Sequence, residues 1–298
     1  MQDKILLTTA FNNEVRIYLS YTKNLVEEAR VIHSLEPTSL AALGRLLTAL
    51  SMMQYMYKDV YFLSLKIEGD GPIKYLITES LKKGTVRGCI GDPNVHINYE
   101  NGKLAVGNAL GEGLLTVKRI NNKEAIYNSS VKLISGEIAE DLTNYFLISE
   151  QTPSSVGLGV LVDVDKSVKE AGGFIVQLLP NASEETITKL ETNLSKITSV
   201  TSLLEEHHSL EYILNIITGG DYHILSEENI KYECGCNKDY YLNVFAKLDD
   251  ATLNELKLDK STEVVCHYCN KSYHFDDQDF DKVEKIKDVL KKEELAKS

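Results

Sequence analysis

Four of the five cysteines stand in two close pairs near the carboxyl end of the 298-residue chain. One residue separates Cys234 from Cys236, two residues separate Cys266 from Cys269, and the segment 237–265 lies between the pairs. Paired thiols in a reducing compartment are more typical of a metal site than of disulfides. Four thiolates suit the tetrahedral coordination of Zn²⁺. We therefore expect Cys234, Cys236, Cys266 and Cys269 to bind one zinc ion.

The spacing of the first pair differs from that of an ordinary zinc ribbon, in which two residues separate the members of each pair. Gly235 leaves this turn free to adopt backbone angles that other residues resist. A disulfide across one residue is strained and is readily reduced again, which suits a reversible switch. Two interpretations stay open: a constitutive structural zinc, or a redox switch in which oxidation of the thiolates ejects the metal.

The size of the metal contribution matters for a module this small. A structural zinc supplies about 10–16 kcal/mol of apparent binding free energy, whereas whole-domain stability is typically about 5–15 kcal/mol. The carboxy-terminal module has many charged residues and should have only a small apolar core. We therefore expect it to fold only when zinc is bound.

Charge divides the chain into three segments. The net charge is −12, of which the segment 181–230 carries −7, the segment 231–298 carries −3 and the segment 1–180 only −2. With 43% apolar and 26% charged residues, the composition is that of a globular protein. We predict a core domain over 1–180, a helical linker over 181–230 and a zinc-binding redox-switch domain over 231–298.

The segment 1–180 has the patterns of an α+β domain with a mixed sheet-and-helix core. A turn signal at Asn12 and Asn13 predicts a hairpin of strands 4–10 and 14–21. Helices are expected at 25–34, where Asn24 and Glu27 resemble a capping pair, and at 40–53, where Thr38 or Ser39 can cap an almost wholly apolar helix. The other predicted elements are strands at 60–68, 73–79, 85–90, 114–119, 131–134, 157–164 and 173–179, and a helix at 138–149.

The segment 181–230 has the apolar spacing of helices. Ile187, Leu190, Leu194 and Ile197 form one stripe, and one or two further short helices are expected before Gly219 and Gly220. Isolated helices of this length are marginal in water, so the segment needs a partner surface.

Other residues that could be reactive or bind a metal are better explained as structural or solvent-exposed residues. Cys89, in a strand-like run, is expected to be a small buried residue. His207 and His208 are adjacent and would point about 100° apart on a helix, so a solvated helix face is expected. His267 is expected to play no part as a ligand, and the segment 282–297 to form a solvated helix.

Several classes of protein are disfavoured. The segment 1–13 lacks the basic and apolar regions of a signal peptide, and no apolar run approaches the length of a membrane span, so we expect a cytoplasmic protein without membrane contact. An acidic chain with a pI of about 5.1 disfavours broad contact with nucleic acid. There is no Walker sequence or dinucleotide fingerprint, so we expect no enzyme activity.

The sequence resembles the heat shock protein 33 family of redox-regulated chaperones along nearly its whole length. The cysteine spacing matches the family pattern. The resemblance also rests on the segments 41–45 (AALGR), 69–73 (GDGPI), 86–88 (VRG) followed by Pro93, 135–141 (SGEIAED), 149–160 (SEQTPSSVGLGV), 171–174 (AGGF) and 177–180 (QLLP). The chain departs from the family at 116–121 and near Leu248 and Asp249, and neither departure touches a cysteine.

The resemblance implies a mechanism. In the reduced state the four thiolates hold Zn²⁺ and the chaperone is inactive. Oxidants, together with an unfolding stress, convert Cys234–Cys236 and Cys266–Cys269 into neighbour disulfides, zinc leaves, and the carboxy-terminal module unfolds. The linker then loses its fixed partner, and apolar surface binds unfolding client proteins without ATP. Family members form a homodimer when oxidised. A metal-dependent fold beside a marginal linker is a bistable element of the kind that such a switch requires.

Two other classes remain as alternatives. A constitutive zinc-ribbon protein that binds nucleic acid or the ribosome is disfavoured by the net charge of −3 in the carboxy-terminal module. An enzyme with a constitutive zinc knob has no nucleophile–base pair or phosphate loop in the sequence to support it.

Overall fold

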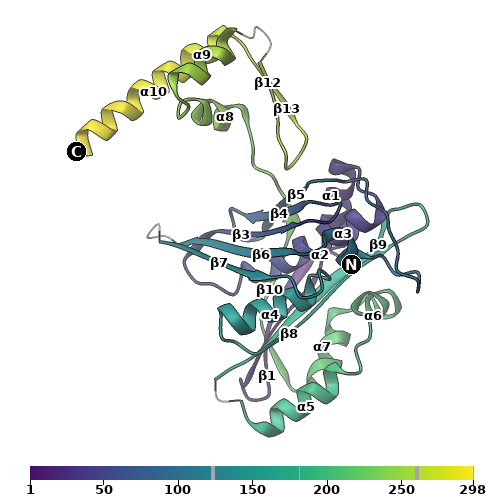
Figure 1. Cartoon of the computed structure of the whole chain (residues 1–298). Coiled ribbons are helices and arrows are strands. Elements are labelled where there is room, and N and C mark those ends of the chain that lie inside the picture. The colour runs from purple at the N-terminus through teal and green to yellow at the C-terminus, as the bar shows by residue number, and fades with distance from the viewer. Residues whose placement is uncertain (122–124, 181, 259–261, 298) are drawn as a thin grey trace. The chain divides into compact units, whose positions relative to one another are not determined.

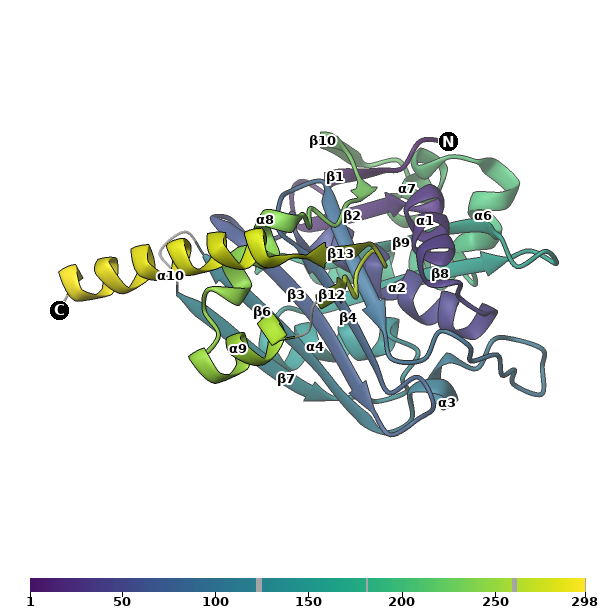
Figure 2. The ribbon, with the colours of Figure 1, turned by 90° about the horizontal axis from the view of Figure 1, so that it is seen from above.

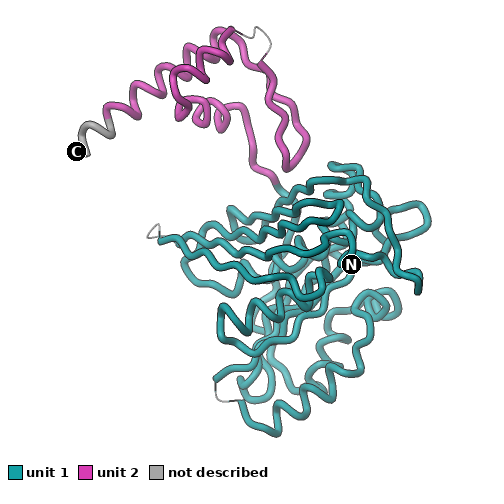
Figure 3. The backbone as a smooth tube through the Cα atoms, in the orientation of Figure 1, with its two compact units in different colours: residues 1–233 teal, residues 234–298 magenta. Residues whose placement is uncertain are grey.

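The computed structural model describes residues 1–121, 125–180, 182–258 and 262–297 (Figure 1). The chain falls into two compact units, Met1–Glu233 and Cys234–Ser298 (Figure 3). The predicted α+β class is confirmed, since both units mix helices with antiparallel strands. The division at residues 180 and 230 stays a prediction, and the two units are described separately below.

The first unit contains a five-stranded antiparallel sheet with the order β10-β1-β2-β9-β8 (Figure 2). Its strands are β1 (Lys4–Ala10), β2 (Val15–Tyr21), β8 (Ser154–Val162), β9 (Val168–Leu178) and β10 (Tyr222–Asn229). The predicted hairpin is confirmed: β1 pairs with β2 in register from Lys4↔Tyr21 to Ala10↔Val15. Asn12 and Asn13 both have positive φ in the turn, a conformation that asparagine tolerates.

A second sheet has six strands in the order β11-β5-β4-β3-β6-β7. Its strands are β3 (Val60–Gly69), β4 (Tyr75–Ser80), β5 (Thr85–Ile90), β6 (Gly113–Asn121), β7 (Ile126–Lys132) and β11 (Lys231–Tyr232). All neighbours are antiparallel except β11, which runs parallel to β5. The predicted strands of the core therefore exist, with ends that shift by a few residues and with β7 beginning earlier than expected.

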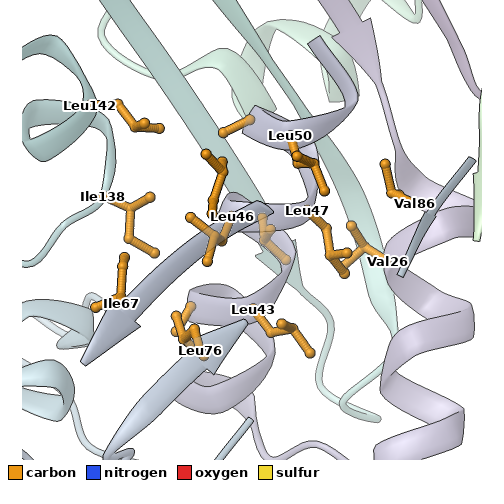
Figure 4. Close-up of a cluster of buried hydrophobic side chains, with 14 of the residues drawn as sticks. Val26, Leu43, Leu46, Leu47, Leu50, Ile67, Leu76, Val86, Ile138 and Leu142 are labelled. Atoms are coloured by element: carbon orange, nitrogen blue, oxygen red, sulfur yellow. The ribbon is translucent and has the colours of Figure 1, made fainter. Parts of the chain in front are cut away.

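Helix α2 (Pro37–Met53) is the centre of the first unit. Nearly all of its residues are buried, as its apolar character on most sides predicts. Figure 4 shows leucines of α2 among side chains of α1 (Lys23–His33), β3, β4 and β5, including Val26, Ile67, Leu76 and Val86. This helix joins the two sheets into one core.

Two predicted helix caps are wrong. The amino-terminal N–H groups of α1 are satisfied from outside the helix, because Asp3 accepts hydrogen bonds from the backbone N–H of Asn24 (3.1 Å) and of Leu25 (2.6 Å). Helix α2 begins after Glu36, with Pro37 in its first turn, where a proline has no N–H to lose. Thr38 instead bonds the backbone of Ile97.

Two further helices complete the core. Helix α4 (Ala139–Ser149) confirms the helix predicted at 138–149, and its first turn is closed by Asp141, which accepts from the N–H of Ile138 (2.8 Å). The short helix α3 (Val106–Leu110) was not predicted, since so short a helix carries too little periodicity to recognise.

The segment 182–230 forms α5 (Glu184–Leu194), α6 (Val200–His207), α7 (Leu210–Thr218) and then strand β10. Each helix starts at a serine whose hydroxyl accepts a backbone N–H: Ser183, Ser199 and Ser209. The predicted helices are confirmed, except that α5 ends at Leu194 and leaves Ile197 of the predicted stripe outside it. Helix α7 ends at Gly219 in a left-handed conformation. Strand β10 corrects the expectation of a wholly helical segment, because alternate residues of 222–229 are half-buried against β1.

The partner surface of these helices is one face of the five-stranded sheet. Their apolar side chains share one buried cluster with Leu6, Ile17, Leu19, Phe174 and Val176 of that sheet. The expectation that the acidic helices need a surface to cover is therefore met within the first unit.

The second unit contains α8 (Lys238–Phe245), α9 (Asp250–Leu258), the hairpin β12 (Thr262–Val265) and β13 (Ser272–Phe275), and α10 (Asp277–Lys297). Its core is small: Leu242, Phe245, Ala246, Leu253, Phe275, Phe280 and Val283. The expected solvated helix at 282–297 starts earlier and is corrected in one respect, because its first turns bury Phe280 and Val283. None of the helices in the described ranges is both long and apolar enough to cross a membrane.

Candidate metal centre

Two turns of the second unit carry the four cysteines. Cys234 and Cys236 lie in the segment before α8, and Cys266 and Cys269 lie in the turn between β12 and β13. Gly235 has a φ of +69°, a backbone angle of the kind that this glycine was expected to allow.

The second turn is fixed by its own backbone. The N–H of Cys266 donates to the carbonyl of Lys271 (3.0 Å), and the N–H of Asn270 donates to the carbonyl of Cys266 (2.8 Å). Asn270 takes the left-handed conformation that reverses the chain, with a φ of +53°. The two sulfurs are therefore held on one side of a tight hairpin turn.

The turns bring the four sulfur atoms together. All four Sγ atoms lie within 4.8 Å of one another, with Cys234 and Cys266 at 3.6 Å and Cys236 and Cys269 at 3.2 Å. A tetrahedral zinc–thiolate centre with Zn–S bonds of about 2.3 Å requires sulfurs about 3.8 Å apart. The residues fit a tetrahedral, thiolate-binding metal ion, and no other group of potential ligands comes together in the described part of the chain.

Two tyrosines next to the sulfurs were missed by the sequence analysis. The hydroxyl of Tyr273 donates to the carbonyl of Cys236 (3.0 Å) and lies 3.2 Å from its Sγ. The hydroxyl of Tyr241 bonds the thiol of Cys266, and the two tyrosine rings lie 5.1 Å apart. The available signal was position, since Tyr241 closely follows the first pair and Tyr273 closely follows the second. Hydroxyls of this kind orient metal ligands.

A comparison with models of known protein families finds one that covers most of the chain. The model of the Hsp33 protein family matches residues 3–276. The chain belongs to the Hsp33 family.

Relatives agree with that assignment. The 33 kDa chaperonin of Acholeplasma laidlawii is 47% identical, covering 95% of this chain and 99% of that protein. The 33 kDa chaperonin of Clostridioides difficile is 44% identical, covering 94% and 97%. The crystal structure of the 33 kDa chaperonin from Thermotoga maritima superposes with a TM-score of 0.88 at 35% identity, over 96% of this chain and 99% of that one. The predicted family resemblance is confirmed.

The thiols of this Hsp33 chain have divergent acidities. Desolvation raises the pKa of Cys234 and also that of Cys269. Desolvation acts on Cys266 too, but hydrogen bonds from Tyr241 and from the N–H groups of Tyr268 and Cys269 outweigh it and lower its pKa to about 6. Thiols this close resist joint ionisation, because each thiolate repels the next. A bound divalent cation reverses that preference, so the cluster is chemically suited to a metal ion.

Three other residues that the sequence offered as reactive groups or ligands are not members of the sulfur cluster. Cys89 is buried in β5 and is not among the clustered sulfurs. His207 stacks on Tyr212, with ring centroids 3.6 Å apart. His267 is exposed and is not in the ligand cluster. The expectations that Cys89 is buried and that His207 lies on an exposed helix face are confirmed, and the expectation for His267 stays a prediction.

Proposed function

We propose that this Hsp33 chain is a redox-regulated, ATP-independent holdase. It is inactive while Cys234, Cys236, Cys266 and Cys269 hold Zn²⁺, and it becomes active when they are oxidised. The observation that carries the proposal is the set of four sulfurs within 4.8 Å of one another in a unit whose apolar core is small. A unit built this way depends on its metal for stability.

The electrons balance in two disulfides. A Zn²⁺ ion with four thiolates loses four electrons and yields two disulfides and free Zn²⁺. Two molecules of oxidant accept two electrons each and consume protons: hypochlorite forms chloride and water, and hydrogen peroxide forms water. The resemblance to the family pairs Cys234 with Cys236 and Cys266 with Cys269. Short sulfur contacts run across the pairs, 3.6 Å for Cys234–Cys266 and 3.2 Å for Cys236–Cys269, so mass spectrometry of the oxidised protein has two distinct pairings to separate.

Release of α5–α7 would supply the client surface. These helices cover an apolar sheet face that includes Leu6, Ile17, Leu19 and Phe174. Unfolding of the second unit removes the ordered continuation of the chain after Glu233, and the marginal helices then separate from the sheet. The exposed apolar face fits unfolded or misfolded client proteins.

We further propose a cytoplasmic location, a homodimer in the oxidised form, no enzyme activity, and no binding to nucleic acid or membranes.

The test compares two forms of the same chain. Reduced zinc-loaded protein and hypochlorite-treated protein are each incubated with a thermally unfolding client while light scattering is recorded, and released zinc is followed with a chromophoric chelator. The oxidised form should suppress scattering, with one zinc released for four thiols consumed. Equal suppression by the two forms would refute redox control, and salt-sensitive binding of the reduced form to RNA would favour the constitutive zinc-ribbon alternative.

A further inference from the structure

A buried carboxylate lies where helix α6 meets the five-stranded sheet. Glu170 of β9 is only 4% exposed. Its Oε2 atom is buried and has no hydrogen-bond partner. Alternation along the strand places Glu170 on the same face as Gly172 and Phe174, which is the face that α6 covers: a Cβ at Gly172 would come within 2.7 Å of Leu204.

Several charged and polar groups surround this carboxylate. Nδ1 of His208, the residue that ends α6, lies 3.6 Å from Oε1 of Glu170, and the imidazole is 66% exposed. From β2, the hydroxyl of Tyr21 interacts with Glu170, and desolvation and this carboxylate raise the pKa of Tyr21. Lys169, the adjacent cation, pairs with Glu205 of α6 at 2.5 Å. Asp3 adds a second buried acidic group that also acts on Tyr21.

A carboxylate in this position opposes the docking of α6. It loses its water shell when the helix covers it, and one oxygen gains nothing in return. It regains that water when the helix leaves. We propose that Glu170 weakens the packing of α6 on the five-stranded sheet. It thereby sets how readily α5–α7 separates from the sheet. The inference deepens the proposed function, in which that separation exposes the client surface.

The first experiment uses the reduced, zinc-loaded full chain and does not depend on chaperone activity. Glu170→Gln removes the charge and keeps an acceptor for Tyr21. Glu205→Gln, which removes the charge of α6 from its exposed pair with Lys169 of β9, is the matched control. Hydrogen exchange followed by mass spectrometry should show the amides of α6 and α7 exchanging about tenfold more slowly in Glu170→Gln, with the control within about twofold of the wild type. Faster or unchanged exchange in Glu170→Gln would overturn the inference, since Glu170 would then hold the helix or be neutral.

A second variant guards against misfolding of the first. In Glu170→Met combined with Tyr21→Phe, both polar groups give way to apolar ones of similar size, a change that often stabilises a buried charged site. It should slow exchange in the same helices, and faster exchange there would contradict the inference.

A separate measurement distinguishes this inference from the proposed function. The oxidant dose for half-maximal suppression of client scattering should rise in Glu170→Gln. If exchange slows while the dose is unchanged, the role of Glu170 at α6 stands and the role of helix release in activation fails.

Discussion

At the scale of single residues, the arrangement of the four sulfurs depends on other groups. Gly235 provides a left-handed turn between Cys234 and Cys236, and Tyr273 bonds the backbone of Cys236 at 3.0 Å. Neither residue contributes a sulfur, yet each helps to position one.

Tyr273→Phe should weaken zinc binding about 10- to 100-fold, because loss of an outer hydrogen bond lets a metal ligand reorient. Competition with a chromophoric chelator in reducing buffer measures the affinity. Tyr240→Phe is the control, since Tyr240 is 52% exposed. Identical zinc affinities of the two variants would mean that the Tyr273 hydroxyl does not position Cys236.

Gly235→Ala should destabilise the zinc-bound second unit by about 1–2 kcal/mol. A Cβ there meets nothing within 4 Å, so the cost is backbone strain alone at a φ of +69°. Gly102→Ala is a matched control in the first unit, with a φ of +80° and equally open space. Chelator-induced unfolding should become easier only in Gly235→Ala, and an equal effect of both changes would place the strain outside the metal-binding turn.

At the scale of elements, the contacts between helices and sheets are made possible by small or charged residues at particular points. Two glycines of the five-stranded sheet face α6: a Cβ at Gly159 would lie 2.6 Å from Thr201, and one at Gly172 would lie 2.7 Å from Leu204. Elsewhere Glu137 joins α2 to the start of α3 by accepting from Arg45 (2.6 Å) and from the N–H of Gly107 (2.9 Å).

Gly159→Ala should loosen α6 and give partial holdase activity without oxidant, because the three atoms nearest the added methyl all belong to Thr201. Thr201→Ser removes the methyl that causes the clash and should restore the inactive state in the double variant. Client light scattering under reducing conditions is the measurement. Activity that persists in the double variant would show that the glycine acts through the sheet and not through α6.

Glu137 should contribute to acid sensitivity of the first unit. Desolvation opposes ionisation, but hydrogen bonds from Gly107, Arg45 and Tyr99 outweigh it and lower the pKa of Glu137 below 4.5. A carboxyl with a lowered pKa contributes stability that is present above the unfolded value and is lost as pH falls through the folded value. Urea unfolding of Glu137→Gln should therefore show a smaller loss of stability below about pH 4.5 than the wild type; parallel curves would exclude this contribution.

At the scale of the whole molecule, each of the two units is stabilised internally by a different means. The first has a large core around α2, whereas the second has a small apolar cluster and one thiol cluster. Their stabilities should therefore respond differently to loss of metal.

Zinc removal by a chelator in reducing buffer should unfold the second unit and leave the first folded. Hydrogen exchange should rise to the unprotected rate in 238–258 and 262–292, while α2 and the strands around it keep their protection. Re-addition of zinc should restore protection, which controls for irreversible damage. Full protection of the second unit without metal would contradict the metal-dependent fold.

The sequence by itself determined the features that depend on local pattern. The cysteine spacing predicted the thiol cluster, the glycine at position 235 predicted a turn with unusual backbone freedom, and the apolar surface of the segment 40–53 predicted a central helix. These features follow from side-chain type and short-range geometry, so neighbours along the chain suffice to specify them.

Only the tertiary structure decided the features that join distant segments. Asp3 caps α1 although the whole β1–β2 hairpin lies between them in the sequence. Strand β10 pairs with β1 across the length of the first unit, and Tyr273 reaches the backbone of Cys236. Nothing in the sequence marks Glu170 as buried, and only the packing of α6 on the sheet makes it so. The physical reason is that burial and hydrogen-bond partners are set by which surfaces meet, and the periodicity of one segment does not specify the segment it will pack against.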